Sequence, residues 1–266
     1  MNLRSYLYAQ SPGKRAIALA NMRENCKRDL PWFVGQPAHR NSIVIVGGGP
    51  SVRSRLGAIR TRQKNGAYVV ALNGAAKFLK ANGITPNMIA FVDYSPVVCG
   101  FLDGTDCEYL VASVCHPSVF DALKDKRVIV WHPDVDDFEQ VKISNLYPHK
   151  PFVTTGGGGM IGVRMPTLAY LFGYRSLHIY GLDSSYADDG ADHAYTKHDG
   201  VEPEARTVTI DGKTYRCSPW MIRQSDEFRD VYQMLRARGC RIHVHGDGLI
   251  PDIWKAMNVA VRSKAA

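Results

Sequence analysis

The nine residues 43–51 read IVIVGGGPS, a short apolar run that passes directly into a glycine-rich turn. An uninterrupted apolar run of this length is typical of a β-strand covered on both faces. Glycine lets the backbone approach a ligand closely, and a helix that starts after such a turn directs N–H groups at an anion. A second stretch of this kind, FVTTGGGGM at 152–160, precedes a helical pattern. Two such turns in one sheet predict a cleft for a phosphorylated ligand.

Apolar runs and helical patterns alternate along the whole chain. Strands are expected at 42–46, 68–72, 88–92, 109–113, 128–131, 177–180 and 241–245, helices at 52–65, 75–81, 160–172, 225–238 and 250–261, and a hairpin at 207–216. The alternation predicts an α/β fold with a doubly wound, mainly parallel, Rossmann-like sheet. We expect residues 1–40 to form a helical N-terminal extension and residues 41–262 to form the Rossmann-like domain, with a flap insert at 184–218.

The composition is that of an ordinary globular protein with a basic balance. The 266 residues are 45% hydrophobic and carry a net charge of +8, and the six cysteines form no C-x-x-C pair that would indicate zinc. No apolar run reaches the roughly 18 residues of a membrane span, and the first residues lack the apolar segment of a signal peptide, so we expect a cytoplasmic protein. Basic residues gather at Arg53, Arg55, Arg60, Arg62 and Lys64. This cluster is either a solvated helix face or a surface for a polyanionic or DNA acceptor.

The first glycine turn departs from both standard nucleotide motifs. Counted from Gly47, the third glycine of a dinucleotide fingerprint falls on Val52, and the second strand ends in Asn73 rather than an acidic residue. The turn also lacks the Lys-Ser/Thr pair of a P-loop. What remains to bind a phosphate is the backbone of Gly47, Gly48 and Gly49 with the Ser51 hydroxyl. Asn73 either reads a base or ribose, or shapes a turn with Gly74.

The other candidate side chains also follow predicted strands. Asp93 and Asp183 could bind magnesium or act in catalysis, and His193 could act as general acid or base. Arg223 could offset charge on a leaving phosphate. Each has a plain alternative, such as capping a turn or lying on the surface. In the second turn, the hydroxyls and amides of four residues could surround a diphosphate: Thr154, Thr155, Gly156 and Gly157.

Three short stretches resemble a known family. VGGGPS at 46–51, ALN at 71–73 and FVD at 91–93 look like the core of the archaeal 6-hydroxymethylpterin diphosphokinase-like family, whose fold is shared by bacterial motility accessory factors linked to sugar transfer onto flagellin. Residues 154–183 also resemble bacterial lipo-oligosaccharide sialyltransferases, and DHA at 192–194 fits the first family.

The resemblance implies a donor site and a choice of chemistry. By analogy with the sialyltransferases, a cytidine nucleotide would be held by Gly49, Ser51, Asn73, Thr154, Thr155 and Gly156. Residues 217–224 lack the late histidine that those enzymes use as a base. The diphosphokinase relatives need a magnesium nucleotide, for which Asp93 and Asp183 are the matching carboxylates.

Three functional hypotheses follow. The first is a nucleotide-dependent transferase, specifically a glycosyltransferase that moves a sugar from a cytidine or uridine nucleotide-sugar to an acceptor hydroxyl. The second is a magnesium-dependent diphosphokinase that moves pyrophosphate from ATP to a hydroxymethylpterin-like alcohol. The third is a non-catalytic nucleotide or nucleic-acid binder. An oligomer is compatible with all three.

Overall fold

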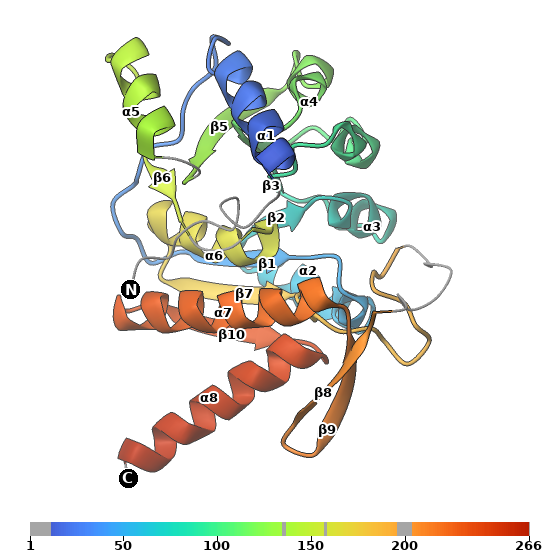
Figure 1. Ribbon diagram of the computed structural model, residues 1–266. Coiled ribbons are helices and arrows are strands. Elements are labelled where there is room, and N and C mark those ends of the chain that lie inside the picture. Colours follow the sequence, from blue (N-terminus) through green and yellow to red (C-terminus); the bar gives the residue numbers. More distant parts are fainter. Residues whose placement is uncertain (1–11, 135–136, 157–158, 196–203, 266) are drawn as a thin grey trace.

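The fold is a single parallel sheet between helices, seen in a computed structural model that describes residues 12–134, 137–156, 159–195 and 204–265 (Figure 1). Eight strands lie in the order β10-β7-β1-β2-β3-β4-β5-β6, and every neighbouring pair is parallel. Their bounds are β1 (Ser42–Val46), β2 (Tyr68–Leu72), β3 (Met88–Phe91), β4 (Glu108–Ala112), β5 (Arg127–Pro133), β6 (Thr154–Thr155), β7 (Ser176–Tyr180) and β10 (Arg241–His245). The predicted α/β, doubly wound architecture is confirmed.

Helices cover both faces of this sheet. They are α1 (Pro12–Asn25), α2 (Leu56–Lys64), α3 (Ala75–Ala81), α4 (Pro117–Ala122), α5 (Asp137–Leu146), α6 (Ile161–Leu171), α7 (Pro219–Ala237) and α8 (Leu249–Ala265), with 3₁₀ turns at η2 (Pro50–Ser54) and η3 (Pro96–Phe101). On one face of the sheet, Ile43 of β1 lines a small cavity together with Met165 of α6. The next residue, Val44, is in register with His178 of β7, and His178 contacts Arg62 of α2. Since successive strand residues point to opposite faces, α6 and α2 lie on opposite sides of the sheet.

Several helices differ from the sequence expectation. The basic helix expected at 52–65 is divided into η2 and α2, and α4 and α5 were not expected. Helix α7 begins at Pro219, six residues before the expected start at 225, because proline has the backbone angle of a first helical residue and needs no N–H partner there. Pro166 lies inside α6 without ending it.

The N-terminal helix is part of the main core. Asn21 and Asn25 of α1 are buried and donate to backbone carbonyls that follow β3 and β4, among them Val114 at 3.1 Å and Cys115 at 2.7 Å. Met22, on the same helix, is packed in the hydrophobic core of the sheet. The extension at 12–40 is therefore anchored by buried amide hydrogen bonds as well as by apolar contacts.

The predicted flap insert has two parts. A loop at 184–195 lies beside the first glycine turn, and an antiparallel hairpin is formed by β8 (Arg206–Ile210) and β9 (Lys213–Cys217). The hairpin contacts α7 and α8, and in Figure 1 it extends away from the strand ends. Among the described residues of the insert, the loop at 184–195 is therefore the part that occupies the position expected of a flap.

Three histidines form a stacked row where β7 and β10 pair. His178 lies parallel to His243, with ring centroids 4.9 Å apart, and its Nδ1 is 3.2 Å from Nε2 of His245. Its Nε2 is 3.1 Å from Arg62 Nη1. Because arginine only donates, Nε2 of His178 must accept, and Nδ1 must carry the proton directed at His245. The geometry thus requires a neutral His178.

Acidification is expected to destabilise the fold through this row. Burial and the charge of Arg62 lower the pKa of His178 to about 3 and that of His245 to about 4. As the pH falls, the histidines therefore bind protons in the unfolded chain before they do so in the folded chain. The stability that the neutral histidines give to the folded state is complete above a pH of about 6.5 and is lost as the pH falls toward these pKa values. We expect His178→Gln, which keeps one acceptor and one donor, to show a shallower loss of unfolding free energy between pH 6.5 and 4. Urea unfolding at stepped pH measures this difference.

The wild type must be compared with His178→Gln because Asp183 changes the free energy of unfolding with pH in the opposite direction. Burial raises the pKa of Asp183 to about 6, so its contribution favours the folded state at low pH and is lost as the pH rises from about 4 to about 6. This contribution is common to both proteins and cancels in the difference. Equal pH slopes for the wild type and His178→Gln would contradict the assignment.

Candidate functional site

A cavity of about 360 Å³ lies at the carboxyl ends of β1, β2, β3 and β7. The chain runs from β1 to β6 in one direction across the sheet and then returns to β7 on the other side of β1. This is the topological switch point, where parallel α/β sheets bind their ligands. Predicted site residues that line it are Gly47, Gly48, Gly49, Asn73, Asp93, Asp183 and His193.

The turn after β1 is joined to the turn after β7 by Asp183. One carboxylate oxygen accepts from the backbone N–H of Ser51 at 2.7 Å, and the other accepts from the Ser51 hydroxyl at 2.6 Å. Asp183 is 3% exposed, and its backbone carbonyl accepts from Ile250 of α8. Its carboxylate and the Ser51 hydroxyl therefore bind each other and hold the site together.

Close packing explains why glycines occupy this turn. A Cβ on Gly47 would collide with the carbonyl oxygen of Gly181, and a Cβ on Gly49 would lie 2.6 Å from the Asp183 carboxyl carbon. Gly48 has a different neighbour, since a Cβ there would lie 2.6 Å from the His193 ring. Gly47 and Gly49 thus let two turns meet, and Gly48 makes room for a cavity-lining side chain.

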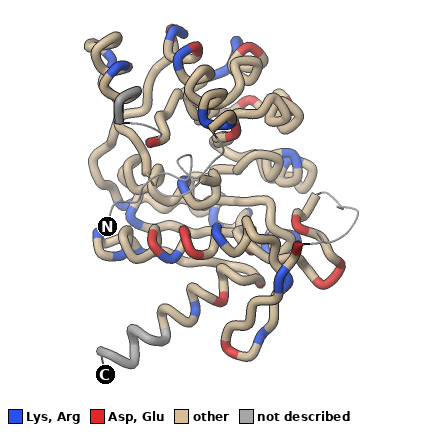
Figure 2. The backbone as a smooth tube through the Cα atoms, in the orientation of Figure 1, with Lys and Arg blue, Asp and Glu red and all other residues tan. Residues whose placement is uncertain are grey.

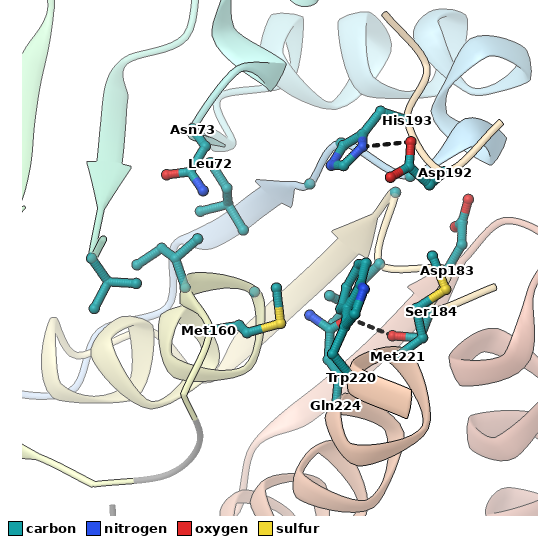
Figure 3. Close-up of a pocket in the computed structure, with 18 of the residues that line it drawn as sticks. Leu72, Asn73, Met160, Asp183, Ser184, Asp192, His193, Trp220, Met221 and Gln224 are labelled. Atoms are coloured by element: carbon teal, nitrogen blue, oxygen red, sulfur yellow. Dashed lines mark hydrogen bonds and ion pairs between the residues drawn. The ribbon is translucent and has the colours of Figure 1, made fainter. Parts of the chain in front are cut away.

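The loop that carries His193 is fastened over this turn. The Ala194 N–H donates to the Gly48 carbonyl at 2.8 Å, and Arg53 donates to the carbonyls of Ala194 at 3.0 Å and His193 at 3.2 Å. Nδ1 of His193 lies 2.9 Å from a carboxylate oxygen of Asp192 (Figure 3). Proton exchange with a substrate would therefore run through Nε2. A histidine oriented by a carboxylate is suited to general acid–base catalysis.

Asn73 and Asp93 line the cavity from the ends of β2 and β3. Asn73 has a φ of 48°, and its buried Oδ1 finds no hydrogen-bond partner in the part of the chain that is described. A left-handed asparagine is costly unless its surroundings or a ligand hold it. Asp93 is exposed and accepts from the Ser95 N–H at 2.8 Å, so it also caps its own turn.

The opposite wall of the cavity is largely apolar. Trp220 and Met221, at the start of α7, face Met160 before α6 (Figure 3). Its polar groups include the Ser184 hydroxyl, which donates to Gln224 at 2.5 Å, and Arg164 of α6. An indole beside polar groups is suited to the flat face of a base or heterocycle.

Other predicted residues lie away from the cavity. Thr154 and Thr155 form β6 at the sheet edge, and neither lines the cavity. Gly156 does not line it, and Gly157 lies outside the described residues. Arg223 is exposed on α7 and does not line the cavity either. The second glycine turn reaches the cavity through its later residues, Gly159–Gly162.

The basic cluster after the first turn is largely engaged in structural contacts. Arg60 donates to the Asn82 carbonyl at 2.7 Å and Arg62 donates to the Tyr180 hydroxyl at 2.8 Å, while Arg53 holds the His193 loop. Figure 2 shows basic and acidic residues interspersed along the chain in this view. These contacts favour a structural role for the arginines over a polyanion surface.

The residues offer limited ligands for a resident metal ion. Within the described ranges, no three His, Cys, Asp or Glu side chains form a group that could hold one. Both oxygens of Asp183 are bonded to Ser51, which leaves Asp93 as the remaining predicted magnesium ligand at the cavity. A protein-held magnesium site therefore does not fit these side chains.

Sequence reasoning missed Arg164, Trp220 and Gln224. The signal for Arg164 was present, because a single charge interrupts the apolar segment IGVRMP at 161–166. Trp220 and Gln224 lie on the first turns of α7, which was expected to begin later.

Across the described helices, none is long and apolar enough to cross a membrane.

Comparisons with known proteins agree with this fold. No curated protein sequence matches the chain. Among solved structures, the MAf glycosyltransferase from Magnetospirillum magneticum AMB-1 is similar with a TM-score of 0.65 and 17% identity over 94% of this chain, which spans 42% of that protein. At this identity the similarity shows the fold alone. The model of the family described as 6-hydroxymethylpterin diphosphokinase MptE-like matches residues 17–189, which include both glycine turns and Asp183. The chain belongs to the 6-hydroxymethylpterin diphosphokinase MptE-like family.

Proposed function

We propose that the chain is a nucleotide-dependent transferase, specifically a glycosyltransferase that moves a sugar from a nucleotide-sugar to an acceptor hydroxyl. The observation that carries the proposal is the His193–Asp192 pair at a switch-point cavity whose walls combine backbone, Asn73 and an apolar surface. The fold shared with a glycosyltransferase supports it.

In this proposal, each wall of the cavity has a role. The cytidine or uridine base would lie against Trp220, with its polar edge or ribose toward the unpartnered Oδ1 of Asn73. The Nε2 of His193 would take the proton from the acceptor hydroxyl, and Asp192 would stabilise the resulting imidazolium. Thr154, Thr155 and Arg223 would reach the donor only through a rearrangement, so we assign them no step.

A panel of nucleotides tests the proposal by thermal shift. CMP, CDP, UDP, GDP and ATP are each added with and without magnesium, and we expect a cytidine or uridine nucleotide to raise the melting temperature without metal. A ligand at a hundred times its Kd adds about 2.7 kcal/mol to the free energy of unfolding, which for a chain of this size corresponds to several degrees. No shift with any nucleotide would refute the proposal.

The family description favours one second candidate, a diphosphokinase that moves pyrophosphate from ATP to a hydroxymethylpterin-like alcohol. Asp93 at the cavity would be its carboxylate, since magnesium is commonly bound by one or two carboxylates together with substrate phosphates. In the same panel, this candidate predicts stabilisation by ATP that requires magnesium. Metal-independent stabilisation by a pyrimidine nucleotide would exclude it.

A further inference from the structure

Arg164 is a fully buried cation with unused hydrogen-bond donors. Its side chain is 0% exposed on α6, and Nη1 donates to the Thr155 carbonyl at 2.6 Å. Nε and Nη2 are buried and find no partner in the described ranges of the chain. A buried guanidinium normally has its donors satisfied, because an unpaired buried charge is strongly destabilising.

Arg164 belongs to the wall of the cavity, as do Gly159 to Gly162 at the start of α6. Its Nε and Nη2 are buried in that wall, so a ligand reaches them only with a shift of the side chain. Helix α6 has eleven residues, and its N-cap residue Met160 supplies no side-chain hydrogen bond. The first N–H groups of a helix have no intrahelical partner and carry its positive dipole end. Two independent sources of positive potential therefore meet at one wall.

Two acidic groups act on Arg164 without a hydrogen bond to it. Glu227 accepts from the Gly159 N–H at 3.2 Å, and its charge and that of Asp134 act on Arg164 from a distance. In the described part of the chain neither carboxylate is hydrogen-bonded to the guanidinium. Burial lowers the pKa of Arg164 to about 10, so the group remains charged at neutral pH and its charge is poorly solvated.

We propose that Arg164, together with the N-terminus of α6, binds a phosphate group of the donor nucleotide. The inference rests on the proposed function and names the group that recognises the phosphate. A phosphate oxygen could accept from Nε or Nη2 and satisfy donors that the protein leaves unused. Arg164 would then stabilise negative charge on the leaving phosphate, the role that the sequence suggested for Arg223.

The test compares nucleotide and nucleoside binding in matched variants. CMP and cytidine, or UDP and uridine if the panel selects that base, are titrated into the wild type, Arg164→Met and Arg164→Lys. The control is Arg175→Met. Like Arg164, which lies over the Trp131 ring at 5.9 Å, Arg175 lies over an aromatic ring and donates to a backbone carbonyl, but it does not line the cavity. We expect Arg164→Met to weaken nucleotide binding at least tenfold and to leave nucleoside binding unchanged, with a smaller loss in Arg164→Lys.

The possible outcomes separate this inference from the proposed function. Nucleotide binding to the wild type with an unchanged nucleotide-to-nucleoside ratio in the Arg164 variants would overturn the inference and leave the proposed function intact. If no nucleotide binds to the wild type, both fail. If Arg164→Met does not fold, Arg164→Lys decides, because it keeps the charge but not the fork of donors. A loss equal to that in Arg175→Met would also overturn the inference.

Discussion

Replacing His193 by alanine is expected to lower turnover by about 10²–10⁴-fold, the usual contribution of a general acid or base. The reason is that His193 is the histidine that lines the cavity in the described structure, and the Asp192 carboxylate lies 2.9 Å from its Nδ1. Asp192→Asn should give a smaller loss, because the imidazole remains but is less well oriented and less able to become charged. Turnover is measured with the nucleotide or nucleotide-sugar that stabilises the wild type.

The control for this prediction is His149→Ala, which removes an exposed histidine that does not line the cavity. Because the His193 side chain is 34% exposed, its removal should leave the melting temperature close to that of the wild type. A folded His193→Ala variant with turnover like that of His149→Ala would remove the histidine from the mechanism and leave Asp93 as the candidate base.

Gly47→Ala is expected to destabilise the protein by about 2–3 kcal/mol, in the upper part of the range for overpacked sites. The added Cβ would collide with the Gly181 carbonyl oxygen, and that backbone is itself held where β1 and β7 pair. Neither turn can move without disturbing the bonds between Ser51 and Asp183. Chemical denaturation measures the loss in the free energy of unfolding.

Gly57→Ala provides the matched comparison. Gly57 lies in α2, and a Cβ there would have nothing within 4 Å. Alanine in place of a helical glycine should stabilise the protein by about 0.5–1 kcal/mol. Two Gly→Ala changes near the same turn are thus expected to act in opposite directions. A neutral Gly47→Ala would show that the contact between the turns is looser than described.

The sequence predicted the sheet well because its strands carry local signals. The runs at 42–46 and 68–72 have the same bounds in the structure, since a strand buried on both faces is apolar at almost every position. The bounds of 241–245 are also the same, although this edge strand alternates exposed and buried residues. The start of α7 was placed too late, since Gln224 in its first turns faces the cavity and Arg223 is exposed. In a sequence, polar helix residues that line a site are difficult to distinguish from the polar residues of a loop.

The candidate site was predicted in part, for a physical reason. Residues directly at strand ends, such as Asn73 and Asp93, line the cavity because the carboxyl ends of parallel strands meet at one edge. Thr154 and Thr155 were expected there too, but their strand is at the far edge of the sheet, and strand order is not a local property of sequence. Asp183 reached the cavity but turned toward Ser51, a contact between residues 132 positions apart.

If the cavity at the switch point binds one nucleotide, calorimetric titration of the stabilising nucleotide into the wild type and His193→Ala should show it. We expect one saturable site per chain in both proteins, with turnover lost only in the variant, because His193 acts on the acceptor rather than holding the donor. Absence of saturable binding of any nucleotide to the wild type would rule out a nucleotide site in this cavity.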